Sequence, residues 1–123
     1  MKSKIILSFL CLFFFASSIF AQTAANMTIA NIDMHYTISS KANTAEPIVI
    51  DVSIVPFKTT EVAKSYFPSI SDNNLTYTYD GSRYVYLTLN HYEGTPTRSI
   101  TEWNTYISNL FGHYATVLAN MNK

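Results

Sequence analysis

The sequence predicts a small α+β domain in which a four-stranded, mainly antiparallel sheet carries a long C-terminal helix across one face. Apolar and polar residues alternate with period two over several segments, an Asp-Gly pair joins two of these segments, and the C-terminal stretch places apolar residues at helical spacing. We expect the elements in the order β-β-α-β-β-α. They are predicted to form one domain over residues 22–123, without internal repeats.

Residues 1–21 have the pattern of a secretory signal peptide. Lys2 and Lys4 precede an apolar run, which closes at Ala21. The run is shorter than the roughly 20 apolar residues of a membrane-spanning helix. We therefore expect cleavage after Ala21, a secreted or periplasmic protein, and no stable membrane insertion afterwards. A retained membrane anchor is the alternative interpretation.

Charge and cysteine usage limit the function classes. Loss of Lys2 and Lys4 with the signal leaves a net charge of about −2, so the basic surface of a nucleic-acid-binding protein is missing from the composition. Cys11, the single cysteine, lies in the signal. The mature chain is therefore expected to fold without disulfides or thiolate metal ligands. Its 9 tyrosines argue against disorder.

Two strands are expected in the first half of the mature chain. The alternation over 30–38 puts five residues on one apolar face: Ala30, Ile32, Met34, Tyr36 and Ile38. A second strand is predicted over 48–57, with Ile48, Ile50, Val52 and Ile54 on its apolar face. Because Pro56 cannot donate a ladder hydrogen bond, the second strand should end there or lie at a sheet edge.

A short helix and a hairpin follow. Thr59 or Thr60 is suited to cap the helix, and Pro68 is expected to end it after about two turns. The segments 75–79 and 84–92 alternate on either side of Asp80-Gly81, which is a strong hairpin signal.

The C-terminal helix has the clearest pattern. Ser99 and Glu102 match the capping box. Apolar residues then recur at steps of three and four, at Ile100, Trp103, Ile107, Leu110, Tyr114, Val117 and Met121. Gly112 is expected to mark a kink or a close backbone approach.

Tyrosines concentrated in the hairpin form the candidate binding site. A two- or four-residue turn would place them on one sheet face, and a three-residue turn would reverse that pairing: the residues are Tyr77, Tyr79, Tyr84, Tyr86 and Tyr92. Tyrosine combines a large apolar ring with a polar tip, which suits recognition of a protein, peptide or glycan. Cross-strand aromatic pairing that stiffens the sheet is the alternative. A sheet edge could also recruit a partner by strand addition.

No catalytic motif is evident, so a non-catalytic binding module is the leading hypothesis and no cofactor is expected. The weak metal-ligand candidates are His35, His91 and Glu93, which lack a recognised zinc spacing. No GxSxG sequence is present. A small hydrolase or metal-dependent enzyme, or a structural subunit of an extracellular assembly, remains an alternative.

Overall fold

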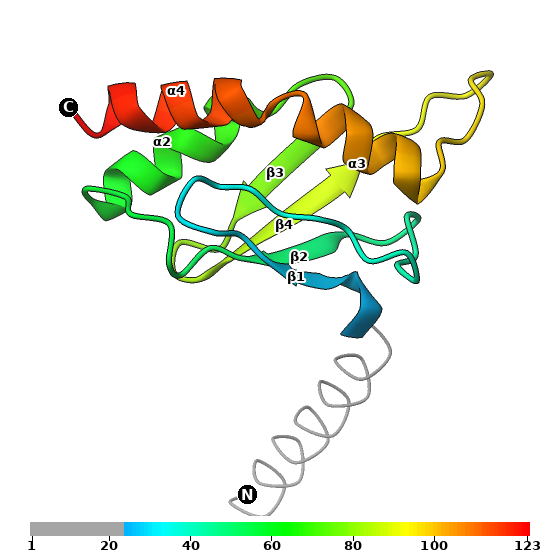
Figure 1. Ribbon diagram of the computed structural model, residues 1–123, viewed down its shortest axis with the longest axis horizontal. Coiled ribbons are helices and arrows are strands. Elements are labelled where there is room, and N and C mark those ends of the chain that lie inside the picture. Colours follow the sequence, from blue (N-terminus) through cyan, green and yellow to red (C-terminus); the bar gives the residue numbers. More distant parts are fainter. Residues whose placement is uncertain (1–23) are drawn as a thin grey trace, which may run out of the picture.

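A computed structural model describes residues 24–123, so the predicted signal peptide lies outside the described part of the chain. The described elements, labelled in Figure 1, are η1 (Ala24–Asn26), β1 (Met27–Ile29), β2 (Ile48–Asp51), α2 (Thr60–Ile70), β3 (Leu75–Tyr79), β4 (Tyr84–Leu89), α3 (Ile100–Ser108) and α4 (Phe111–Met121). The predicted α+β class is confirmed.

The sheet is mixed, with the strand order β1-β2-β4-β3. β1 runs parallel to β2, whereas β2 with β4 and β4 with β3 are antiparallel. The expectation of a mainly antiparallel sheet is therefore wrong. Parallel neighbours need a long connection that returns the chain to the same end of the sheet, and residues 30–47 supply it.

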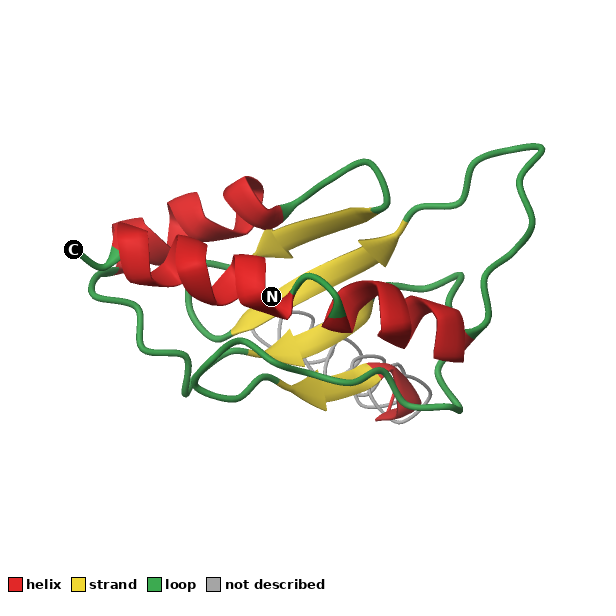
Figure 2. Ribbon diagram, turned by 45° about the horizontal axis from the view of Figure 1, so that its top comes forward, coloured by secondary structure: helices red, strands yellow, loops and turns green. Residues whose placement is uncertain are grey.

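The described helices α2, α3 and α4 all cover the same face of the sheet (Figures 1 and 2). Period-two burial follows from this one-sided arrangement, because successive side chains of a strand point to opposite faces. On β4, Val85, Leu87 and Leu89 are buried towards the helices, while Tyr86 and Thr88 are exposed. The opposite face of the sheet is called the open face below.

The strand expected over 30–38 is absent, and the ladder of β1 ends where Ala30 N–H donates to Asp51 O. The Asn31 side chain then accepts from the backbone N–H groups of Asp33 and His35, which closes a turn with Met34 at φ 65°. Four of the five residues in the predicted apolar face are nevertheless buried. The exception, Ile32, is 61% exposed.

Two further boundaries differ from the prediction. β2 ends at Asp51, because its carboxylate accepts from Ser53 N–H and turns the chain before Pro56. α2 begins as expected after Thr59, whose hydroxyl accepts from Val62 N–H. It does not end at Pro68 but continues to Ile70, which is 3% exposed. Burial of Ile70 offsets the backbone hydrogen bond that Pro68 cannot make.

The single C-terminal helix of the prediction is two helices. The capping box at Ser99 and Glu102 is present as expected. The chain then leaves regular α geometry at Asn109 and Leu110, just before Gly112, and α4 begins at Phe111.

The β3–β4 hairpin has a three-residue turn. Asp80 N–H donates to Tyr84 O, which leaves Gly81, Ser82 and Arg83 as the loop. The Asp80 carboxylate accepts from the backbone N–H groups of Ser82, Arg83 and Tyr84. Gly81 has φ 88°, a backbone conformation that glycine adopts without strain. This turn pairs Tyr77 with Leu87 and so directs Tyr77 towards the helices.

Beneath the helices, three tyrosine hydroxyls form a buried chain. Tyr36 Oη and Tyr77 Oη are 2.5 Å apart, and Tyr77 Oη and Tyr114 Oη are 2.7 Å apart. Burial raises the pKa of Tyr36 and Tyr77 well above the ordinary value and that of Tyr114 to about 12, so the phenols keep their protons. These hydrogen-bonded hydroxyls join the 30–47 connection, the sheet and α4.

Replacing Tyr77 with Phe should destabilise the fold by about 2 kcal/mol, because it leaves two buried hydroxyls without their shared partner. Urea unfolding measures this change. Tyr86→Phe is the matched control: Tyr86 is 40% exposed, and its loss of a hydroxyl should alter stability by less than about 0.5 kcal/mol. Equal effects of the two substitutions would contradict the tyrosine chain.

Candidate functional site

The five tyrosines predicted to form one platform are divided between different environments. Tyr77 is buried, and Tyr79 is half-buried with its ring 5.1 Å from that of Phe67. Tyr84 and Tyr86 lie on the open face. Tyr92 follows β4, and its hydroxyl donates to a carbonyl in the 70–74 loop. The turn has three residues, which is the alternative that separates Tyr77 and Tyr79 from Tyr84 and Tyr86, so the five tyrosines do not share one face.

The open face is nonetheless built by all four strands. The strand registers align Met27, Val49, Tyr86 and Thr78 in one row across the sheet. The neighbouring row contains Ile29, Asp51 and Tyr84, and Ile29 is 65% exposed. The centre of this face is thus apolar and aromatic, and threonines lie towards the β3 edge.

Two more exposed isoleucines lie at one end of the sheet. β1 ends at Ile29 and β2 ends at Asp51, and these two residues are paired in the sheet. Ile32 lies three residues after Ile29, and Ile54 lies three residues after Asp51. Ile32 is 61% and Ile54 is 53% exposed. The prediction placed both on buried strand faces. The turn-forming Asn31 and Asp51 were the available signals that β1 ends before Asn31 and that β2 ends at Asp51.

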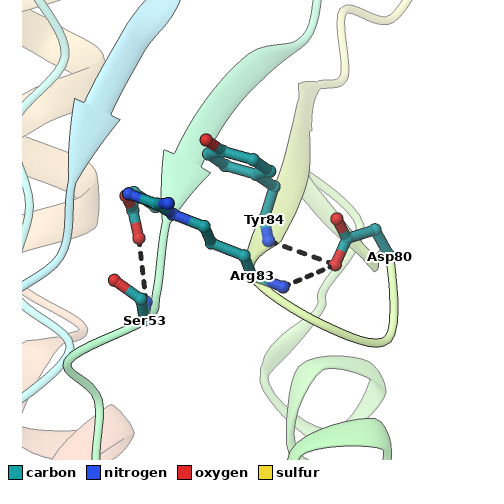
Figure 3. A network of polar contacts seen from close by, with 5 residues as sticks. Ser53, Asp80, Arg83 and Tyr84 are labelled. Atoms are coloured by element: carbon teal, nitrogen blue, oxygen red, sulfur yellow. Dashed lines mark hydrogen bonds and ion pairs between the residues drawn. The ribbon is translucent and has the colours of Figure 1, made fainter.

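Arg83 and Asp51 form an ion pair on this face, and Figure 3 shows Arg83 beside Tyr84. Arg83 Nη2 and Nε donate to Asp51 Oδ2 at 2.8 and 3.0 Å, and Arg83 Cζ lies 5.4 Å from the centre of the Tyr84 ring. The hydrogen bonds from Arg83, followed by the one from Ser53, lower the pKa of Asp51 to about 2. The charges of Arg83 and Asp51 balance within the pair, and the Asp80 carboxylate at the turn adds a negative charge beside it.

The two sheet edges differ in how accessible they are to a further strand. At β3, Asp72 and Ser71 already bond the outward groups: Asp72 Oδ1 accepts from Leu75 N–H, Asp72 N–H donates to Leu75 O, and Ser71 Oγ accepts from Tyr77 N–H. At the other edge β1 has only 3 residues. Both features are ways in which proteins limit edge pairing, so the open face is the stronger candidate site.

The candidate metal ligands do not come together. His35 stacks on Phe111 with a ring-centre distance of 4.2 Å. His91 and Glu93 lie in the exposed connection after β4, not on the strand where their spacing would direct them to one side. Within residues 24–123, no group of three His, Cys, Asp or Glu side chains is placed to hold a metal ion.

Comparison with known proteins gives no assignment: no protein family, curated protein or solved structure matches this chain. None of the helices in the described region has the length and apolar character needed to cross a membrane.

Arg83→Gln should raise the pKa of Asp51 from about 2 towards its ordinary 3.8, with the Ser53 hydrogen bond holding part of the shift. A lowered folded-state pKa adds stability above the unfolded-state pKa, and this contribution is lost as the pH falls towards 2. The variant should therefore lose less stability than the wild type between about pH 4 and pH 2.

An NMR titration of the Asp51 carboxyl carbon measures this pKa directly. Arg98→Gln is the matched control, since Arg98 makes no hydrogen bond to Asp51, and it should leave the titration unchanged. The same pKa in wild type and Arg83→Gln would contradict the assigned cause.

Proposed function

We propose that the mature protein is a secreted or periplasmic, non-catalytic binding module that docks another protein on the open face of its sheet. One observation carries the proposal: four of the five large apolar side chains that are most exposed in the described region lie on this face or at the adjoining strand ends. They are Ile29, Ile32, Ile54 and Tyr86; the fifth is Tyr92. Exposed apolar side chains that gather in this way are typical of interaction surfaces.

The chemistry of the face favours a protein partner over a glycan or a nucleic acid. Branched aliphatic side chains such as Ile29 pack against other apolar side chains, and they offer neither a flat ring nor hydrogen bonds to a sugar. The charged groups Arg83 and Asp51 neutralise each other, so a polyanion gains little there. Tyr84 and Tyr86 supply the aromatic anchors that protein interfaces often contain.

The export step of the proposal is supported by the pattern of residues 1–21. An exported protein without cysteines in its mature chain meets its partner in an oxidising compartment while it depends on packing alone for stability. A rigid sheet backed by helices suits that setting, because a preformed surface loses little conformational entropy on binding.

A photo-reactive benzoylphenylalanine at position 86 should therefore crosslink to one protein other than this chain when the full-length protein is expressed with its own leader. The same group at Ala119, an exposed position on α4, is the matched control and should not give that product. Once the partner is purified, Tyr86→Ser and Ile29→Lys should each raise its Kd by about tenfold or more.

Three results would contradict the proposal. They are a product that contains only two copies of this chain, equal crosslinking from positions 86 and 119, and unchanged affinity of both variants for the purified partner.

A further inference from the structure

A pocket of about 340 Å³ lies at the opposite end of the hairpin from the exposed isoleucines. It is lined by Asn74, which directly precedes β3, by the 90–98 connection and by the first turn of α3. The yellow connection and the start of α3 are visible at the right of Figure 1. Volumes of this order are typical of small-molecule sites. None of the residues proposed to dock a protein lines it.

Arg98 is fixed at this pocket by two aromatic rings. Its guanidinium carbon lies 4.8 Å from the centre of the Trp103 ring and 5.1 Å from that of Tyr106. Tyr106 is itself held, because its hydroxyl donates to Asp72 Oδ2 at 2.8 Å and accepts from Asn74 Nδ2 at 3.1 Å. A guanidinium that contacts two neighbouring rings keeps its planar fork in one orientation, which lowers the entropy lost when it binds a ligand.

The Arg98 guanidinium donates no hydrogen bond to any of the described residues. Its Nη1 atom is buried without a hydrogen-bond partner, and the described ion pair joins Arg83 and Asp51 instead. A buried charged donor without an acceptor costs free energy that an incoming acceptor would recover. Arg98 also lines a second hollow of about 350 Å³ on the side of Thr105 and Asn109, so the guanidinium borders open space on two sides.

The nearby carboxylates are already engaged elsewhere. Glu102 Oε1 accepts from Ser99 N–H in the capping box, at 3.1 Å. Asp72 accepts from the Tyr106 hydroxyl and from the backbone N–H groups of Asn74 and Leu75. The pocket therefore combines an oriented cation with two acids that other donors hold: both oxygens of Asp72 accept hydrogen bonds, and Glu102 accepts one through Oε1. The Ser99 hydrogen bond and, to a smaller extent, the Arg98 charge lower the pKa of Glu102.

We infer that this pocket binds a carboxylate-bearing ligand, with the carboxylate on the Arg98 guanidinium and the rest of the ligand against Tyr92 and Pro96. An arginine fork matches the two oxygens of a carboxylate. Tyr92, which is 50% exposed, presents ring surface at the pocket, and His91 lines the pocket beside it. A free organic acid and the C-terminal carboxylate of a peptide share this chemistry.

The single tryptophan of the chain, Trp103, reports on the site because Arg98 stacks on it. Titration of the intact mature protein with benzoate, and separately with a tetrapeptide whose C-terminus is free, should give a saturable change in Trp103 fluorescence. Benzamide and the C-terminally amidated peptide should give none. The tighter of the two acids identifies the source of the carboxylate.

Arg98→Gln should raise the Kd of the preferred acid by about tenfold or more, and Arg98→Lys should restore only part of the affinity, since lysine lacks the planar fork. Arg83→Gln, which changes an arginine at the far end of the hairpin, is the matched control and should bind as the wild type does. Tyr86→Ser should also bind normally, which separates this test from that of the protein-docking face.

The inference is overturned if neither acid gives a saturable change with the wild type. It is equally overturned if benzamide binds as well as benzoate, or if Arg98→Gln, shown to be folded by circular dichroism, binds as the wild type does. The wild-type comparison of benzoate with benzamide decides the question even if the variant does not fold.

Discussion

The register of the β3–β4 hairpin is the constraint on which the rest of the molecule depends. Side chains alternate between the faces of a sheet, so one residue more or fewer in the turn would exchange the faces of every residue on one of the strands. Asp80 sets the length of the turn by accepting from three consecutive backbone N–H groups. Tyr77 consequently faces the helices and Tyr86 faces solvent. Without this turn, only the burial of apolar side chains in the core would decide which face of the sheet each hairpin residue takes.

The buried phenols explain how residues 24–123, which contain no cysteine, hold a long irregular connection in place. Residues 30–47 contain no helix or strand, yet the Tyr36 hydroxyl anchors them to Tyr77, which in turn bonds the Tyr114 hydroxyl. Tyr66 adds a hydroxyl bond to the Tyr114 carbonyl at 3.0 Å. Each ring contributes apolar area while its hydroxyl finds a partner inside the core. The core therefore constrains the connection, and with it the parallel placement of β1.

The sequence predicts the features that depend on hydrogen bonds within a few residues. It does not predict the features that depend on how distant segments pack against one another. The Ser99 capping box, the Thr59 cap and the Asp80-Gly81 hairpin act within a few residues, and each was predicted. The parallel pairing of β1 depends on the whole 30–47 connection, and the turn at Asn31 competes with a strand that the alternation alone favours. The arrangement of the tyrosines was missed for the same reason, because it depends on whether the turn has one residue more or fewer. Nothing in the spacing indicated that Arg98 would contact the rings of both Trp103 and Tyr106.

The two ends of the hairpin differ in chemistry because different elements complete them. At the turn end, Arg83 forms an ion pair with Asp51, and the large exposed apolar side chains nearby are aliphatic and aromatic. At the other end, the cap of α3 occupies Glu102, so Arg98 keeps its charge against two rings. Both arginines contact aromatic rings, and what separates them is whether a carboxylate accepts hydrogen bonds from the guanidinium. This difference is the physical basis on which we propose an uncharged protein surface as the partner of one end and an anionic ligand for the other.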